Sequence, residues 1–535
     1  MDVMTTEGSR MNASVLIVGA GPTGLTLGCS LARAGVAVRI IEKSPEFHRG
    51  SRGKGLNHRS RELLADLGLD EELTASGTEP IVLRTYRDGV HVADTCSWDF
   101  EETRPDVPYS SGLLLPQWRT EELLRGKLAE YGVRVELGCE LTGFTQDEHG
   151  VRAALADGRT IEADYLAGCD GGKSFVRKAL GVRFEGETAA EEMMVIGDVE
   201  ADGLDRGYWH QWFGEGAGIM LCPFRGTSHW QFQGAAGTDE RGRLPEPTLE
   251  VFQELFDRVA GVPGVRLANP TWQSTYRVNV RMADRFREGR VFIVGDAAHV
   301  HSIAGGLGMN TGIQDAFNLG WKLALVVGGV AGPGLLDTYE EERLPVAAWT
   351  LKTSNEGLRR IVEGIPEGRV GTDVGANAET STLGVGYRWS SLSGGAGEWA
   401  AEGDGLAAGD RAPDAPCRDA ATGRPVRLFE KFAGPWHTLL GFGPESAKAL
   451  ARAEAEYAGP LRTCLIDGGP EGLDDHEGYA RAAYGMEGGG VVLVRPDDYV
   501  ALRLTGGVPD RGAAVVDHLR SLGRRGGRIS SGVRP

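Results

Sequence analysis

The stretch Ser14-Val15-Leu16-Ile17-Val18-Gly19-Ala20-Gly21-Pro22-Thr23-Gly24 decides the fold that we expect for this chain. Its apolar beginning predicts a buried strand, and the glycine turn leads into a helix over 25–34 that ends at Gly35. The apolar residues 36–41 predict the next strand. Because a helix connects the two strands, they can pair in parallel and form a βαβ unit. The sequence therefore predicts an α/β fold that begins with a parallel sheet.

The glycines of this turn have the spacing Gly-x-Gly-x-x-Gly, and each has its own physical purpose. The first permits the tight turn, the second lets a pyrophosphate approach the backbone, and the third lets the helix pack on the strand. The helix N-terminus favours the phosphates, and an acidic side chain at the end of the second strand can bind ribose hydroxyls. We therefore predict a dinucleotide site, for NAD or for FAD, at Gly19, Gly21, Pro22, Thr23, Gly24, Glu42 and Lys43.

Two further glycine-rich motifs follow buried apolar segments. One is Gly168-Cys169-Asp170-Gly171-Gly172-Lys173-Ser174, which continues to Arg177. The other covers 289–299 and runs on into 305–310. Taken alone, Asp170 is explained by a hairpin turn and Asp296 by a helix cap, because Asp is common at both.

The three motifs, in this order and spacing, resemble those of the flavoprotein aromatic hydroxylases typified by p-hydroxybenzoate hydroxylase. The similarity is closer still to the bacterial hydroxylases that tailor aromatic polyketides. It covers nearly the whole chain and includes Asn310-Thr311-Gly312-Ile313-Gln314-Asp315-Ala316 and Tyr339-x-x-Glu342-Arg343. The resemblance implies a Rossmann-like FAD-binding domain, an inserted and mainly antiparallel β-sheet domain that binds the substrate, and a C-terminal thioredoxin-like domain.

Changes in sequence texture give the expected boundaries of these parts. The expected order is the FAD-binding domain (11–183), the substrate-binding sheet (184–284), the second part of the FAD-binding domain with long helices (285–393), a linker (394–409), the thioredoxin-like domain (410–522) and a frayed basic tail (523–535).

The resemblance also assigns further cofactor contacts. Gln117 matches the glutamine that contacts FAD between its two halves, and Asp296 matches the aspartate that bonds the ribityl chain. Asp170 would serve FAD packing and the approach of NAD(P)H. Ser174 and Arg177 either hold the turn at Asp170 together or contact a ligand.

Gly308, Met309 and Asn310 open a helix, so their backbone N–H groups would face the pyrimidine edge of the flavin. A helix N-terminus stabilises an anion such as reduced flavin by ~0.3–1 kcal/mol, and by more where water is excluded. The chain departs from the family at Ile303, where Pro is usual, and at Leu307, where Gln is usual. Both positions would lie near the flavin ring and affect its seating.

The loop 49–55 matches the family's segment beside the isoalloxazine ring. We expect Arg52 to stack near the ring or to contact the peroxide, acting in catalysis and cofactor binding. The alternative is a phosphate or surface contact. Glycines around Arg52 would let the loop move as the flavin swings between reduction and oxygenation.

Aromatic side chains occur on short alternating strands between 208 and 233. They are either core residues, because aromatic rings fill any sheet interface, or the wall of a ligand site. His210 is a candidate catalytic base, against the alternative of a structural histidine. The predicted substrate contacts are Tyr208, His210, Trp212, Met220, Cys222, Trp230 and Phe232.

Composition excludes several other classes of protein. The net charge of −18 over 535 residues argues against a nucleic-acid partner. The longest apolar stretch, 323–336, is broken by glycines and Pro333 and is too short for the ~20 residues of a membrane span. Residues 1–10 are polar and unlike a secretory signal. These features indicate a cytoplasmic protein without a membrane partner.

The seven cysteines form no C-x-x-C pair and no His/Cys cluster, which is typical of reduced thiols and predicts no metal site. Cys417 and Cys464 stand alone in the thioredoxin-like part. We therefore expect that part to serve packing or assembly, since thioredoxin chemistry needs C-x-x-C.

The resemblance implies a flavin monooxygenase. NADPH or NADH would reduce FAD, O2 would add at flavin C4a, and the hydroperoxide would hydroxylate a polycyclic aromatic substrate where water is excluded. The alternatives are Baeyer–Villiger oxygenation, a non-oxygenating FAD oxidoreductase, or a protein that holds FAD only structurally. Only one full βαβ fingerprint is present, so we expect the pyridine nucleotide to bind transiently. The expected assembly is a monomer or a homodimer.

Overall fold

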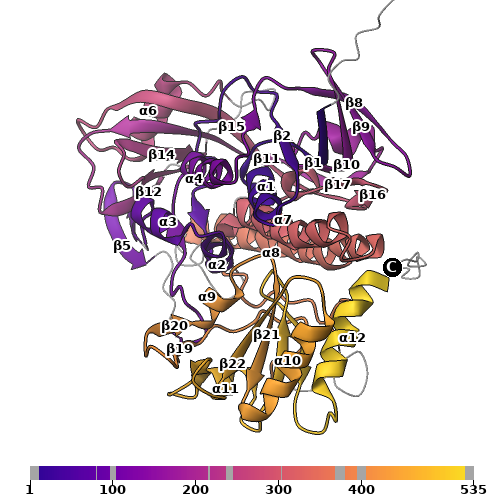
Figure 1. The fold of residues 1–535 in the computed structure, drawn as a ribbon. Coiled ribbons are helices and arrows are strands. Elements are labelled where there is room, and N and C mark those ends of the chain that lie inside the picture. The colour runs from indigo at the N-terminus through magenta and orange to yellow at the C-terminus, as the bar shows by residue number, and fades with distance from the viewer. Residues whose placement is uncertain are drawn as a thin grey trace, which may run out of the picture.

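The structure is a computed structural model that describes residues 11–79, 81–96, 104–214, 217–235, 245–302, 304–367, 380–394 and 405–524. Ile303 and residues 1–10 therefore lie outside the described residues, as do most of the expected linker and tail. Hydrogen bonding joins the strands into three large sheets and one small sheet, which pairs β3 (Gly55–Leu56) with β6 (Leu113–Leu114). Figure 1 shows the three large units along the chain.

The first sheet contains the predicted βαβ unit. Strand β1 (Met11–Val18) pairs in parallel with β2 (Val38–Ile41) and with β10 (Thr160–Gly168), and β10 pairs in parallel with β17 (Val291–Ile293). Parallel strands of this kind are buried on both faces, which explains their continuous apolar sequence. The other strands of this sheet are β7 (Val135–Glu136), β8 (Leu141–Gln146), β9 (Val151–Leu155) and β16 (Arg287–Glu288).

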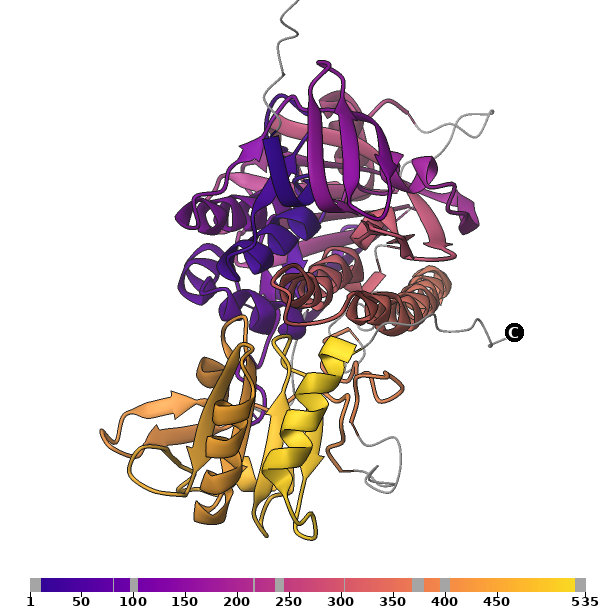
Figure 2. The ribbon, with the colours of Figure 1, turned by 45° about the vertical axis from the view of Figure 1, so that its right-hand side comes forward.

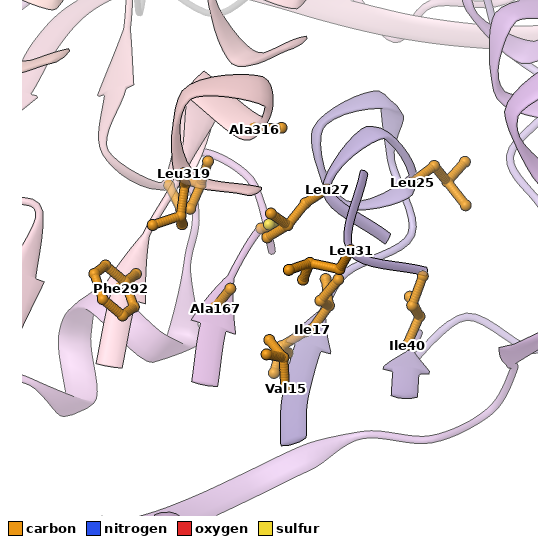
Figure 3. Close-up of a cluster of buried hydrophobic side chains, with 14 of the residues drawn as sticks. Val15, Ile17, Leu25, Leu27, Leu31, Ile40, Ala167, Phe292, Ala316 and Leu319 are labelled. Atoms are coloured by element: carbon orange, nitrogen blue, oxygen red, sulfur yellow. The ribbon is translucent and has the colours of Figure 1, made fainter. Parts of the chain in front are cut away.

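Two helices pack on this sheet and complete its core. Helix α1 (Pro22–Arg33) places Leu27 and Leu31 close to Ile17 of β1, as Figure 3 shows. Helix α7 (Leu307–Val327) packs beside α1 and adds Leu319 to the same cluster. The other helices of this part are α2 (His58–Asp66), α3 (Asp70–Ser76), α4 (Gln117–Glu130), α5 (Phe175–Ala179) and α8 (Asp337–Glu367), with short 3-10 turns η1 (Gly295–Ala297), η2 (Ala304–Gly306) and η3 (Pro333–Leu336).

The second sheet has one face covered by helix α6 (Leu249–Val259). Its strands, in order across the sheet, are β18 (His299–Val300), β15 (Leu267–Ala283), β11 (Phe184–Ala201), β14 (His229–Gly234), β13 (Ala217–Pro223), β12 (Tyr208–Gly214), β4 (Val82–Arg87) and β5 (Val90–Cys96). The sheet thus extends beyond the expected range 184–284, because β4 pairs in parallel with β12. Strand β5 is mostly exposed, and its sequence alternates only over Val90-His91-Val92, which is too short to predict this edge.

The third sheet has the arrangement of the thioredoxin fold. Strands β21 (His437–Phe442) and β22 (Leu461–Ile466) are parallel and joined by α10 (Ala447–Glu456). The antiparallel pair β24 (Gly490–Val494) and β25 (Val500–Leu504) follows, and then α12 (Arg511–Arg524). The remaining elements are β19 (Pro416–Asp419), β20 (Pro425–Arg427), β23 (Leu473–Asp474), α9 (Leu428–Phe432), α11 (Tyr479–Tyr484) and η4 (Pro444–Ser446).

Buried ion pairs fasten this third unit to helices α7 and α8, against which it lies in Figure 1 and Figure 2. The guanidinium of Arg495 lies 2.6 Å from the carboxylate of Glu342, and the ammonium of Lys322 lies 2.7 Å from the same group. Arg495 also pairs with Asp497 at 2.6 Å. Burial alone would raise the pKa of Glu342, but Arg495 and Lys322 hold that pKa well below its usual range. The carboxylate is therefore ionised and bound to both units.

Candidate active site

The three glycines of the first turn have three different surroundings. Gly19 has φ +104°, and a Cβ atom there would lie 2.4 Å from the carbonyl oxygen of Cys169. A Cβ atom at Gly24 would lie 2.1 Å from the carbonyl oxygen of Gly19. A Cβ atom at Gly21 would meet no atom within 4 Å, and α1 begins there without a side-chain cap. The fold itself requires the first and third glycines, whereas the space beside Gly21 is open to a ligand.

Glu42 lies beside this turn with a fixed orientation. Its carboxylate accepts hydrogen bonds from the backbone N–H groups of Ala20 and Ser44, both at 3.0 Å. Pro22 is the first residue of α1. Thr23 packs against Gly312 of α7, where an added Cβ atom would lie 2.4 Å from the Thr23 hydroxyl. Lys43 is exposed.

Asp170 and its neighbours hold their own turn together. The carboxylate of Asp170 accepts hydrogen bonds from the hydroxyl of Ser174 at 2.5 Å and from the backbone N–H of Phe175 at 2.6 Å. Arg177 donates to the carbonyl oxygens of Ala297 and Gly172 at 2.7 and 2.9 Å. These contacts cap α5 and tie the second motif to the third, which favours the structural explanation for Ser174 and Arg177.

Asp296 and Arg52 approach each other from distant parts of the chain. The side chain of Asp296 is exposed, yet desolvation by the surrounding protein raises its pKa, and the charges of His299 and Arg52 oppose that rise. An exposed carboxylate with limited hydration lies in a concave position. Arg52 is also exposed, and it forms no hydrogen bond or ion pair with the residues that the structure describes. Both charged groups are therefore available to a ligand.

Asp315 of α7 fixes the turn that carries Asp296. Its carboxylate accepts hydrogen bonds from the backbone N–H of Gly295 at 3.2 Å, from His299 at 2.7 Å and from Arg343 at 2.6 Å. Burial alone would raise the pKa of Asp315, but Arg343 and His299 lower it below its ordinary value. Asp315 is thus an ionised anchor between α7, α8 and the third motif.

The first turn of α7 is not capped by a side chain. Gly306 before it has the left-handed φ of 62°, which brings the chain into the helix with its first N–H groups free of side-chain partners. A Cβ atom at Gly308 would lie 3.3 Å from the ring of His301. Leu307, at which the chain departs from the resembling family, is buried.

The loop 49–55 contacts both Gln117 and the start of α7. A Cβ atom at Gly53 would lie 3.3 Å from the amide oxygen of Gln117 and 3.3 Å from the sulfur of Met309. Gln117 accepts a hydrogen bond from the N–H of Gly53 at 3.1 Å. The side chain of Asn310 ties the same segments together, because it donates to the carbonyl oxygen of Gly55 at 3.0 Å. The structure therefore brings these predicted cofactor residues into one place.

The predicted substrate residues divide between the two faces of the second sheet. Trp212, Trp230 and Phe232 lie in the core beneath α6. Met220 and Cys222 lie on the opposite face, since they pair with Gln211, Gln233 and Gln231 rather than with residues of that core. We call the side that α6 does not cover the uncovered face, although the loop 49–55 packs on part of it. It consists of Trp209, Gln211, Met220, Cys222, Gln231 and Gln233, of which Met220 and Gln233 are half-buried and the others are buried.

His210 lies on the face beneath α6. Its ring stacks on Trp212 with centroids 5.3 Å apart. One ring nitrogen lies 2.8 Å from the carbonyl oxygen of Asp205, and the other lies 3.4 Å from the hydroxyl of Tyr86. Burial lowers the pKa of His210. These contacts favour the structural alternative for His210. Tyr208 lies on the same face, and the guanidinium carbon of Arg84 lies 3.4 Å from the centroid of its ring.

The loop 49–55 lies against the uncovered face. The backbone N–H of Ser51 donates to Asp198 at 2.9 Å, and the ammonium of Lys54 donates to Gln231 at 2.7 Å. The predicted substrate residues did not include Lys54, Trp209 or the three glutamines. The alternation along β12 separates Trp209 and Gln211 from His210 and Trp212, but that period does not say which face a helix will cover.

The residues present fit FAD. The open space at Gly21 suits a pyrophosphate. The exposed carboxylate of Asp296 suits a ribityl chain. The uncapped first turn of α7 suits a ring that carries negative charge. Across the described ranges there is no group of three or more His, Cys, Asp or Glu side chains that could hold a metal ion. In the same part of the chain, no helix has both the length and the apolar character needed to cross a bilayer.

Comparison with known proteins agrees with this site. Residues 12–354 match the family model described as FAD binding domain. The chain is 39% identical to a flavin-dependent monooxygenase of Mycobacteroides abscessus, over 95% of this chain and 99% of the other. It is 35% identical to 6-methylpretetramide 4-monooxygenase of Streptomyces rimosus, over 91% and 90% of the two chains. Its structure matches that of aklavinone-11 hydroxylase in a ternary complex with FAD and aklavinone, with a TM-score of 0.82, 28% identity and 97% and 100% coverage.

The chain therefore belongs to the FAD-binding family of flavin-dependent monooxygenases. It is an FAD-dependent monooxygenase whose FAD unit is followed by a thioredoxin-like unit, as the sequence predicted.

Proposed function

We propose that this monooxygenase uses NADPH or NADH and O2 to hydroxylate a polycyclic aromatic substrate of the polyketide type. The observation that carries the proposal is the uncovered face of the second sheet. It presents Trp209, Met220 and Cys222 together with glutamine amides to the loop 49–55. An apolar and aromatic wall with a few polar groups is what a small-molecule site requires. Relatives named for 6-methylpretetramide and for aklavinone support a substrate of this class.

The chain's own residues bind the cofactor and control access to it. The glycine turn and Glu42 would hold the ADP half of FAD, Gln117 would contact FAD between its two halves, and Asp296 would bond the ribityl chain. The N–H groups at 307–310 would stabilise negative charge on the ring. When bound, FAD supplies electron transfer from the pyridine nucleotide and the activation of O2. Arg52 is exposed and has no hydrogen bond or ion pair with the described residues, so it would supply positive charge beside the ring.

The substrate would lie beside the loop 49–55, where Met220 and Gln233 of the uncovered face are half-buried. Of the predicted substrate residues, this arrangement retains Met220 and Cys222. Trp209, Gln211 and Gln233 join them, while the residues beneath α6 stabilise the sheet from behind. This closed arrangement would keep water from the reacting atoms.

The experiment is a substrate panel with the purified, FAD-loaded protein under 18O2. Polycyclic phenols are incubated with NADPH and, separately, with NADH, and the products are examined by mass spectrometry. We expect at least one compound to gain a single 18O atom as a new hydroxyl group. Oxidation of both nucleotides without oxygenation of any panel compound would overturn the proposal. A lactone product would show that the enzyme performs a Baeyer–Villiger oxygenation instead of a hydroxylation.

A further inference from the structure

One cation of the loop 49–55 lies directly on the uncovered sheet face. The ammonium of Lys54 lies 4.3 Å from the ring centroid of Trp209 and 2.7 Å from the amide oxygen of Gln231. The side chain is half-buried, so part of it remains accessible. Lys54 follows Gly53, which contacts Gln117 and Met309. The ammonium is thus placed between the predicted flavin ring and the predicted substrate wall.

The surrounding groups leave this ammonium without an ionic partner. No carboxylate of the described residues lies within ion-pair distance of Lys54, and Asp198, which influences it from β11, binds both the N–H and the hydroxyl of Ser51. Burial raises the pKa of the Cys222 thiol to about 11, so the thiol is neutral at pH 7. Burial lowers the pKa of Lys54 to about 8, although the charge of Asp198 opposes that change. Desolvating an unpaired cation is unfavourable, and an anionic ligand would offset that cost.

We propose that Lys54 binds an ionised oxygen, a phenolate or an enolate, of the aromatic substrate whose ring packs beside Trp209. The inference rests on the proposed function and names the group that the substrate must carry. Three N–H donors are available on the ammonium, and Gln231 takes one of them. The positive charge lowers the pKa of the bound hydroxyl, whose proton leaves to solvent. The resulting anion makes the ring richer in electrons, which favours attack by an electrophilic oxygen.

The test uses 2-hydroxyanthraquinone, whose ionised phenol absorbs at longer wavelength than the neutral form. The dye is titrated into the FAD-loaded protein without NAD(P)H, and its apparent pKa is read from difference spectra. In the wild type we expect the pKa of the bound dye to fall by at least about one unit below that of free dye. We expect Lys54→Met to lose this shift and to bind the dye about tenfold more weakly at pH 7, while Lys54→Arg keeps the shift.

Two controls separate this role from a structural one. Lys448→Met changes an exposed lysine of α10 and should leave the dye's pKa and affinity unchanged. The wild type alone gives a second readout that does not depend on any variant folding. Its affinity for the ionised dye should fall as pH rises through about 8, because the Lys54 ammonium then loses its charge.

An unshifted dye pKa in the wild type, a shift that persists in Lys54→Met, or an affinity for ionised dye that stays flat across pH 8 would each overturn the inference. These outcomes are independent of the oxygenation panel. A wild type that oxygenates the panel but fails the dye test disproves only the role of Lys54. A wild type that passes the dye test but oxygenates nothing disproves the proposed function instead.

Discussion

Gly21 and Gly24 belong to one motif, yet a methyl group should have different effects at the two positions. At Gly24 a Cβ atom would collide with the backbone of Gly19, whereas at Gly21 it would project into open space. We expect Gly24→Ala to lower the unfolding temperature of the apoprotein. Gly21→Ala should leave that temperature unchanged and weaken FAD binding at least about tenfold, since the methyl group displaces the pyrophosphate. Calorimetry of apoprotein and flavin fluorescence titration measure the two effects, and equal apoprotein stabilities would contradict this assignment.

Asp170 and Asp296 each follow a buried strand, and only their surroundings distinguish them. The carboxylate of Asp170 is bonded to the start of α5, while that of Asp296 is exposed. Asp170→Ala should therefore cost about 0.5–2 kcal/mol of stability, as the loss of a helix cap does. Asp296→Ala should release FAD, with a rise in Kd of about tenfold or more, because a charged hydrogen-bond partner is lost. Urea unfolding and FAD titration of both variants check this, and an Asp296→Ala variant with unchanged FAD affinity would refute the ribityl role.

Helix α4 carries a buried acid beside the predicted cofactor residue Gln117. Glu121 accepts a hydrogen bond from the Gln117 amide at 2.9 Å, and burial raises the pKa of Glu121 from 4.5 to about 7. The folded protein thus holds this proton more tightly than the unfolded chain does. Its stability must therefore fall as pH rises from about 4.5 to about 7, and the full loss persists above pH 7.

Glu121→Gln keeps the acceptor for Gln117 and removes the charge. We expect this variant to have a higher unfolding temperature than the wild type above pH 7, and a nearly equal one at pH 4.5. The matched control is Glu122→Gln, whose side chain is 51% exposed and should show no such dependence on pH. Thermal unfolding of the FAD-loaded proteins between pH 4.5 and 8.5 gives the comparison, and parallel curves for Glu121→Gln and wild type would contradict it.

The two faces of the second sheet should respond differently to truncation. Phe232 is fully buried and stacks on Phe252 of α6 with centroids 4.7 Å apart. Phe232→Ala should lower the free energy of unfolding by about 3–5 kcal/mol. Met220 on the uncovered face is half-buried, so Met220→Ala should cost less stability and chiefly raise KM. Chemical unfolding and steady-state kinetics test the pair, and a larger loss of stability for Met220→Ala would reverse our assignment of the faces.

At the scale of the whole molecule, one carboxylate joins the thioredoxin-like unit to the FAD unit. Glu342 pairs with Lys322 and Arg495, and all three side chains are nearly inaccessible. Glu342→Gln leaves two buried cations undercompensated and should cost about 3–5 kcal/mol. Arg495→Met alone should also destabilise, and the double variant should lose less than the sum of the two. Thermal unfolding of the wild type, the two single variants and the double variant gives a double-mutant cycle. Strictly additive losses of stability would show that Glu342 and Arg495 are not coupled.

The two cysteines of the thioredoxin-like unit, Cys417 and Cys464, are free and buried. Burial raises the pKa of Cys417 to about 12 and that of Cys464 to about 11, which keeps both thiols protonated at pH 7. Buried ion pairs join this unit to α7 and α8, and its role in packing or assembly stays a prediction.

The βαβ unit, the need for glycine at Gly19 and Gly24, and the two later motifs follow from the local sequence alone. Each of these depends on contacts between near neighbours or on a backbone conformation that a single glycine permits. The family resemblance, which also rests on these motifs, led to FAD and to the thioredoxin-like unit without redox cysteines.

Tertiary packing determines which charges serve the fold and which stay exposed. Asp170 and Asp296 have similar sequence surroundings, but long-range packing gives the first its partners and leaves the second exposed. The faces of the second sheet were likewise decided by where α6 packs, and the place of Lys54 by contacts between loop 49–55 and strands far along the chain. The two-residue period of side chains along a strand determines which residues share a face, but the burial of that face depends on residues distant in sequence.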